Sequence, residues 1–131
     1  LTGDIPKELG LMRELTFLDL EANLLTGPIP TSFGNLSELY YLGLIKYQLS
    51  GPVPATLGYI PSLDVLGVSS NNLEGNLEFL SSLSNCRELQ ALDIYNNSFS
   101  GGIPVHVYKI ILVWSRLKQV NWWGSIIIVQ L

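Results

Sequence analysis

Leucines recur along the chain at fixed spacings. Segments that start at Leu15, Leu39, Leu63 and Leu89 align with one another, and the first three are 24, 24 and 26 residues long. They share the frame L-x-x-L-x-L-x-x-N-x-L-x-G-x-I-P-x-x-L-G-x-L-x-x, and residues 1–14 match its second half. In L-x-x-L-x-L, apolar and variable positions alternate, which predicts a short strand with one buried face. The x-x-L-G-x-L part predicts a short helical or 3₁₀ segment on the outer side of each copy.

One copy of the frame cannot bury its own leucines, so the frame predicts a solenoid in which stacked copies bury them for each other. Asn23, Asn71 and Asn97 follow the predicted strands at one fixed offset. A buried asparagine can donate to and accept from backbone groups of its own and the neighbouring copy, which predicts a structural ladder of asparagines. Tyr47 takes this position in the second copy, so we expect a gap in the ladder there. The longer third copy predicts an extended outer helix over residues 78–85.

The frame resembles the plant-specific class of leucine-rich repeats, whose mark is the element L-x-G-x-I-P. This element, or a close variant of it, occupies residues 25–30, 49–54 and 99–104, and residues 1–6 begin a further instance. The resemblance covers residues 1–104. It implies an α/β leucine-rich-repeat solenoid, a right-handed superhelix with a concave parallel sheet, short outer helical or 3₁₀ segments and a second, less regular sheet at the G-x-I-P stretches.

The resemblance also implies a non-enzymatic recognition module. Members of this class are mostly extracellular, and the chain resembles a fragment of the ectodomain of a receptor-like kinase or receptor-like protein at the plasma membrane. Such a module would bind a protein or peptide ligand, with a co-receptor as a further partner. Two alternatives stay open: a secreted protein like the polygalacturonase inhibitors, which need complete cysteine caps, and a truncated gene product with no autonomous function.

The variable strand positions are the candidate ligand-binding residues, because they would face outward on the concave side. Exposed aromatic side chains are credible anchors for a ligand, although an ordinary solvated sheet can carry the same residues. Gly67 and Ser69 predict a flat patch of small residues, which would suit an extended peptide. The candidate binding residues are Phe17, Asp19, Glu21, Tyr41, Ile45, Val65, Ser69, Asp93 and Tyr95, with Gly43, Gly67 and Ala91 at the same kind of position.

Two N-glycosylation sequons occur, at Asn35-Leu36-Ser37 and at Asn96-Asn97-Ser98. Asn35 falls in the outer half of a copy, where we expect it to be exposed. Asn96 stands at the end of a predicted strand beside the ladder position, where we expect crowding.

Charge and cysteine content narrow the possible functions. Residues 1–104 carry four basic and 11 acidic side chains, a net charge of −7, which argues against nucleic acid as a partner. Cys86 is the single cysteine, so no intramolecular disulfide can form, and His106 is the single histidine. We therefore expect no catalytic residues, no metal site and no cofactor. No apolar run is long enough for a transmembrane helix and no signal-peptide pattern is present, so we expect a membrane anchor, if any, in a longer parent protein.

The tail, residues 105–131, departs from the frame. A fifth strand in the same register would start at Val113 and place Arg116 and Lys118 at core positions, where buried charge is costly. We therefore expect no fifth regular strand and low order after Trp114. The tail is either an improvised cap or sequence from outside the repeat.

Overall fold

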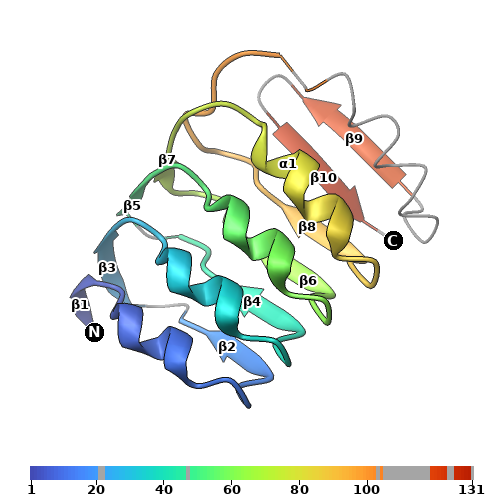
Figure 1. Ribbon diagram of the computed structural model, residues 1–131. Coiled ribbons are helices and arrows are strands. Elements are labelled where there is room, and N and C mark those ends of the chain that lie inside the picture. Colours follow the sequence, from blue (N-terminus) through green and yellow to red (C-terminus); the bar gives the residue numbers. More distant parts are fainter. Residues whose placement is uncertain (21–22, 47, 103, 105–118, 124–125, 131) are drawn as a thin grey trace.

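The computed structural model describes residues 1–20, 23–46, 48–102, 104, 119–123 and 126–130. The repeats stack side by side into a solenoid, with one sheet along one flank, a second sheet along another and helical segments between them (Figure 1). This is the leucine-rich-repeat architecture that the frame and the resemblance predicted, and the fold class is confirmed.

The first sheet, which we call the inner sheet, contains one short parallel strand from each repeat. These strands are β2 (Phe17–Asp19), β4 (Tyr41–Gly43), β6 (Val65–Gly67) and β8 (Ala91–Asp93). Their middle residues face the core, and each leucine there is at most 9% exposed. The alternation of apolar and variable positions forms strands because it places one leucine of each strand in the stacked core. Burying each such side chain stabilises the fold by about 1.5–3 kcal/mol.

The second sheet forms where each repeat passes from its asparagine position to its glycine. Its strands are β1 (Thr2–Asp4), β3 (Leu24–Gly27), β5 (Gln48–Gly51) and β7 (Asn72–Leu73), paired in that order. The glycine of each L-x-G-x-I-P element has a positive φ, as at Gly27 (72°) and Gly51 (75°), a conformation that side chains with a Cβ rarely adopt. The second sheet implied by the resemblance is therefore present.

Helical segments line the outer side. They are η1 (Lys7–Leu11), η2 (Thr31–Asn35), η3 (Ala55–Tyr59), and in the longer third copy α1 (Phe79–Ser82) followed by η4 (Leu83–Asn85). The first three are 3₁₀ helices that each follow a proline. In the third copy, α1 and η4 follow one another where the longer outer helix over residues 78–85 was predicted.

The glycine of the x-x-L-G-x-L element sets how closely these outer segments stack. A Cβ added at Gly10 would lie 2.5 Å from the carbonyl oxygen of Ser32, and one added at Gly34 would lie 2.6 Å from that of Thr56. A Cβ at Gly58 would come closer still to the carbonyl oxygen of Ser82. Only glycine allows this backbone approach, so the recurring glycine is explained by packing between neighbouring repeats.

The asparagine positions form hydrogen bonds between repeats. The Asn71 side-chain amide donates to the Leu44 carbonyl oxygen of the preceding repeat at 2.7 Å, and its Oδ1 accepts from the Leu49 N–H at 3.2 Å. Asn97 Nδ2 donates to the Val68 carbonyl oxygen at 3.0 Å, and Asn23 Oδ1 accepts from the amino group of Leu1 at 2.8 Å. The predicted gap at residue 47 lies outside the described residues.

The tail contributes a β-hairpin next to β8. Strands β9 (Gln119–Trp123) and β10 (Ile126–Gln130) pair antiparallel, and β10 pairs antiparallel with β8, with Ile128 opposite Asp93 (Figure 1). Antiparallel pairing needs neither the repeat frame nor its register, and the expectation of low order after Trp114 stays a prediction. Val113, Arg116 and Lys118, on which the argument against a fifth parallel strand rested, lie outside the described residues.

Candidate ligand-binding face

The variable positions of the inner sheet form rows that cross the strands, because the strands pair in register. The first row contains Phe17, Tyr41, Val65 and Ala91, and the second contains Asp19, Gly43, Gly67 and Asp93. A third row follows the strand ends with Ile45, Ser69 and Tyr95, while Glu21, its predicted first member, lies outside the described residues. We call these rows together the concave face.

An aromatic cluster occupies one end of the concave face. The rings of Phe17 and Tyr41 are stacked, with centroids 4.4 Å apart and an angle of 10° between the planes. Tyr40 lies tilted against Phe17 at 6.1 Å. Phe17 and Tyr40 are 47% and 46% exposed, so the cluster presents open ring surface. Tyr40 was missed from the sequence because it precedes the strand, although the adjacent pair of tyrosines was a visible signal.

The middle of the concave face is not the flat patch of small residues that we expected. A Cβ added at Gly67 would lie 2.9 Å from Cδ1 of Ile45, so the Ile45 side chain covers this glycine. Tyr41 and Asp19 lie over Gly43 in the same way, with the Tyr41 hydroxyl 3.2 Å and Asp19 Oδ1 3.1 Å from the position of an added Cβ. The small residues therefore form a floor beneath larger neighbours.

Ser69 does not face solvent as a binding residue, as we expected, because the structure buries it completely. Its hydroxyl donates to Oδ2 of Asp93 on the neighbouring repeat at 2.9 Å, which turns the serine toward that carboxylate and away from solvent. Oδ1 of Asp93 is shielded from solvent and has no hydrogen-bond partner among the described residues. Ser69 therefore positions Asp93 and does not itself offer a surface to a ligand.

The concave face carries acidic and no basic side chains at its described row positions. Asp19 is exposed, and Asp93, Val65, Ile45 and Tyr95 are partly buried. The face therefore combines aromatic surface at one end with carboxylates at both ends of its second row.

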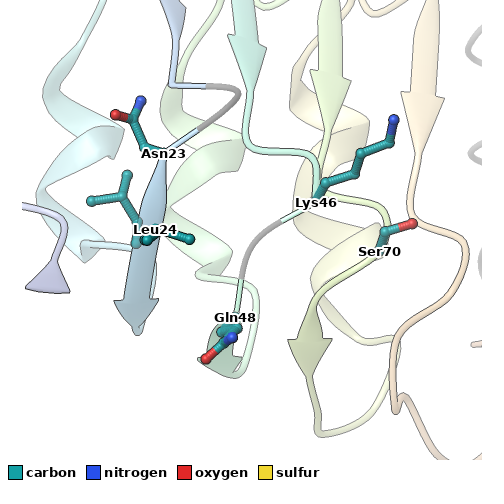
Figure 2. A pocket seen from close by; sticks show the side chains of 6 residues that line it. Asn23, Leu24, Lys46, Gln48 and Ser70 are labelled. Atoms are coloured by element: carbon teal, nitrogen blue, oxygen red, sulfur yellow. The ribbon is translucent and has the colours of Figure 1, made fainter. Parts of the chain in front are cut away.

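A separate pocket of about 520 Å³ lies outside the concave face, where the inner-sheet repeats turn toward the second sheet (Figure 2). Among the described lining residues, Lys46 provides the one cationic side chain, and Leu24, 72% exposed, provides apolar surface. Lys46 and Ser70 both have positive φ there, 65° and 57°. The pocket is lined by Asn23, Leu24, Leu25, Lys46, Gln48 and Ser70.

The two sequon asparagines differ in their surroundings. Asn35 is exposed at the end of η2, on the outer side of the solenoid. Asn96 is also exposed, but its Nδ2, the atom that a glycan would join, donates to the Ser70 hydroxyl at 3.3 Å, and its φ is 53°. Glycan attachment at either position stays a prediction, and the geometry favours Asn35.

Cys86 lies in the core and is fully buried. Burial raises the pKa of its thiol to about 11, so the reactive thiolate is scarce at neutral pH. Within the described part of the chain, no three His, Cys, Asp or Glu side chains are grouped so that they could hold a metal ion, and no helix is long and apolar enough to cross a membrane. His106 lies outside the described residues.

Comparison with known proteins agrees with the fold. The family described as Leucine Rich Repeat matches residues 14–36 and 88–110. Among solved structures, the ectodomain of the Arabidopsis thaliana receptor kinase GASSHO1/SCHENGEN3 in complex with CASPARIAN STRIP INTEGRITY FACTOR 2 is 36% identical, with a TM-score of 0.77 over 83% of this chain. The structure named PEPR1-AtPEP1 is 36% identical, with a TM-score of 0.80 over 88% of the chain. The Arabidopsis thaliana SOBIR1 ectodomain is 37% identical, with a TM-score of 0.73 over 84%.

The chain spans 13%, 15% and 59% of these three proteins respectively. No curated protein sequence is significantly similar to it. The repeat frame, the two sheets, the asparagine bonds and these likenesses agree. The chain therefore belongs to the leucine-rich repeat family, and its repeats are of the plant type found in receptor-kinase ectodomains.

Proposed function

We propose that the chain is a recognition segment of an extracellular plant receptor-like protein and that its concave face binds a peptide or protein ligand. The observation that carries the proposal is the aromatic cluster of Phe17, Tyr40 and Tyr41. Rigid aromatic side chains with exposed ring surface are the commonest energetic anchors of protein interfaces. The similar ectodomain of GASSHO1/SCHENGEN3, whose structure holds CASPARIAN STRIP INTEGRITY FACTOR 2, supports a ligand of this kind.

The same geometry supports a role in binding over a role in catalysis. The buried Cys86 thiol has a raised pKa, and the carboxylates of the concave face stand at opposite ends of a row with Gly43 and Gly67 between them. Paired acid–base chemistry needs two groups close to one reacting atom. We therefore place the function of the face in docking, with any signalling carried by other parts of a parent protein.

The proposal is tested by panning a phage-displayed random peptide library on the immobilised chain. Three targets are compared: the wild-type chain, the double variant Phe17→Ser/Tyr41→Ser, and the control Tyr59→Ser, which removes a tyrosine that is 70% exposed on the outer side. Circular dichroism first establishes that all three are folded. We expect peptides to be enriched on the wild type and on the control and to be lost on the double variant. Equal enrichment on all three targets would refute a binding role for the aromatic cluster.

A further inference from the structure

The outer segments end at equivalent residues in three successive repeats. Leu11 is the last residue of η1, Asn35 of η2 and Tyr59 of η3, and the three segments lie side by side (Figure 1). The residue after each has a similar backbone conformation, with φ and ψ of −82° and 65°, −80° and 71°, and −91° and 99°. The three side chains therefore leave the solenoid at equivalent places, and we call Leu11, Asn35 and Tyr59 the outer row.

The same hydrogen bond joins each outer segment to the next one. The Ser32 hydroxyl donates to the Lys7 carbonyl oxygen at 2.7 Å, and the Thr56 hydroxyl donates to the Thr31 carbonyl oxygen at 2.8 Å. The glycines just before the outer row bring the backbones into contact, so neighbouring segments are no further apart than the roughly 8–10 Å of packed helices. The middle member of the outer row is therefore flanked closely by the other two.

Both flanking members of the outer row expose large apolar side chains. Leu11 is 76% exposed and Tyr59 is 70% exposed, whereas Leu36 and Ile60, which directly follow row positions, are fully buried. The row position itself thus faces solvent. Apolar side chains that gather at one exposed place mark a surface on which another group packs.

The middle member of the outer row can supply that group. Asn35 begins the sequon Asn35-Leu36-Ser37, in which Asn35 and Ser37 are exposed and Leu36 is in the core. An N-linked glycan begins with N-acetylglucosamine bonded to Nδ2 of the asparagine, so its first sugar stays next to both flanking side chains. In the other sequon, by contrast, Nδ2 of Asn96 donates to the Ser70 hydroxyl.

The chemistry of this first sugar matches the flanking side chains. A pyranose ring has one face made of C–H bonds, and the electron-rich face of an aromatic ring attracts polarised C–H groups. The Tyr59 ring suits the C–H face of the sugar, and Leu11 offers hydrocarbon to its acetyl methyl group. The sugar hydroxyls stay in water, so apolar surface is covered without burying polar groups that lack partners.

We propose that Asn35 carries an N-linked glycan whose first N-acetylglucosamine packs on the Tyr59 ring, with Leu11 bordering the sugar on the opposite side. The outer row is then a binding site for the chain's own glycan, which covers the outer side of the solenoid and leaves the concave face open. Attachment requires secretion, so the inference shares the extracellular location of the proposed function but not its ligand.

The attachment step uses an oligosaccharide donor linked to a lipid diphosphate, which the secretory pathway supplies. A bond forms between Nδ2 of Asn35 and C1 of the first sugar, while the bond from C1 to the diphosphate oxygen breaks. The lipid diphosphate leaves with the bonding electron pair, and Nδ2 loses one proton. No oxidation or reduction takes place.

The test uses the full chain secreted from eukaryotic cells that make high-mannose glycans. Every protein carries Ser98→Ala, which removes the second sequon and leaves Asn96 in place. An endoglycosidase trims the glycan at Asn35 to one N-acetylglucosamine, which mass spectrometry verifies, and Asn35→Gln is the sugar-free reference. Circular dichroism gives the Tm of both forms. We expect the single sugar to raise the Tm by about 2–5 °C.

Variants of exposed apolar residues locate the sugar. Tyr59→Ser should reduce the gain in Tm to less than about 1 °C, and Tyr59→Phe, which keeps the aromatic ring, should retain the gain. Leu24→Ser removes a side chain of similar exposure, 72%, from the second sheet and should leave the gain unchanged. In NMR spectra, the ring current of Tyr59 should shift the C–H protons of the sugar upfield, and Tyr59→Ser should abolish this shift.

Several results would overturn the inference: an unglycosylated Asn35 in the secreted chain, no gain in Tm from the sugar, a gain that Tyr59→Ser retains, or equal effects of Tyr59→Ser and Leu24→Ser. None of these results bears on peptide binding, because the panning experiment concerns the aromatic cluster of the concave face. Equal enrichment of peptides in that experiment would remove the proposed function and leave the glycan contact standing.

Discussion

Replacing Asn71 by alanine should destabilise the whole repeat array. Asn71 is 7% exposed, and its amide donates to the carbonyl oxygens of Leu44 at 2.7 Å and of Val68 at 3.0 Å. Its Oδ1 accepts from the Leu49 N–H at 3.2 Å. The bonds to Leu44 and Leu49 join two repeats, so their loss weakens the contact between neighbouring repeats.

The expected size of this effect follows from the groups left without partners. A buried backbone donor or acceptor that loses its partner costs about 1–3 kcal/mol. The Leu44 carbonyl and the Leu49 N–H both lose the Asn71 side chain, so Asn71→Ala should lower the free energy of unfolding by about 2–4 kcal/mol. That is a large share of the roughly 5–15 kcal/mol typical of a folded domain.

Urea denaturation followed by circular dichroism measures this loss. Asn72→Ala is the matched control, because Asn72 is the exposed neighbour in β7, and we expect a change below about 0.5 kcal/mol. Asn71→Leu fills the space without forming the bonds and should be about as destabilised as the alanine variant. An Asn71→Leu variant as stable as the wild type would show that Asn71 contributes volume and not hydrogen bonds.

Three further predictions concern packing, modification and titration. Gly58→Ala should lower the free energy of unfolding by about 1–3 kcal/mol, because the new Cβ would collide with the Ser82 backbone. A Cβ at Gly102 meets nothing within 4 Å, so Gly102→Ala should change the free energy of unfolding by less than about 0.5 kcal/mol. Equal changes for the two variants in urea denaturation would contradict the close backbone approach at Gly58. When the chain is secreted from eukaryotic cells, mass spectrometry should find an N-glycan that Asn35→Gln removes, and an unchanged glycan mass in that variant would refute the assignment. The pKa of Cys86 rises from 9.0 to about 11 on folding, so its contribution to stability should be fully present below pH 9 and be lost as the pH rises toward 11. Cys86→Ala should remove this pH dependence from the free energy of unfolding, measured by denaturation at a series of pH values. An unaltered pH dependence in the variant would assign it to other groups.

The repeat frame predicted the parts of the fold that depend on periodic packing. Strands, outer segments and the extended helix over residues 78–85 each follow from where apolar side chains recur and from the spacing of glycine and proline. The frame could not represent the hairpin of β9 and β10, because its antiparallel pairing with β8 follows no repeat register.

The candidate site was less predictable than the fold, because the direction of each side chain determines which residues reach the surface. Ser69 and Asp93 were both expected to face solvent, but Ser69 is fully buried and its hydroxyl donates to Asp93. The leaning of Ile45 over Gly67 depends on contacts between neighbouring strands that no single repeat contains. Tyr40 was overlooked because it precedes the strand, and its contact with Phe17 joins two repeats.

The close backbone contacts at Gly10, Gly34 and Gly58 reach beyond local packing. They fix the spacing of the repeats on the outer side, while strand pairing fixes it on the inner side, and the ratio of the two spacings determines the curvature of the solenoid. A larger residue at any of these glycines would widen the outer spacing and bend the array more tightly. The spacing of the row positions on the concave face is thus adjustable from the opposite side of the molecule.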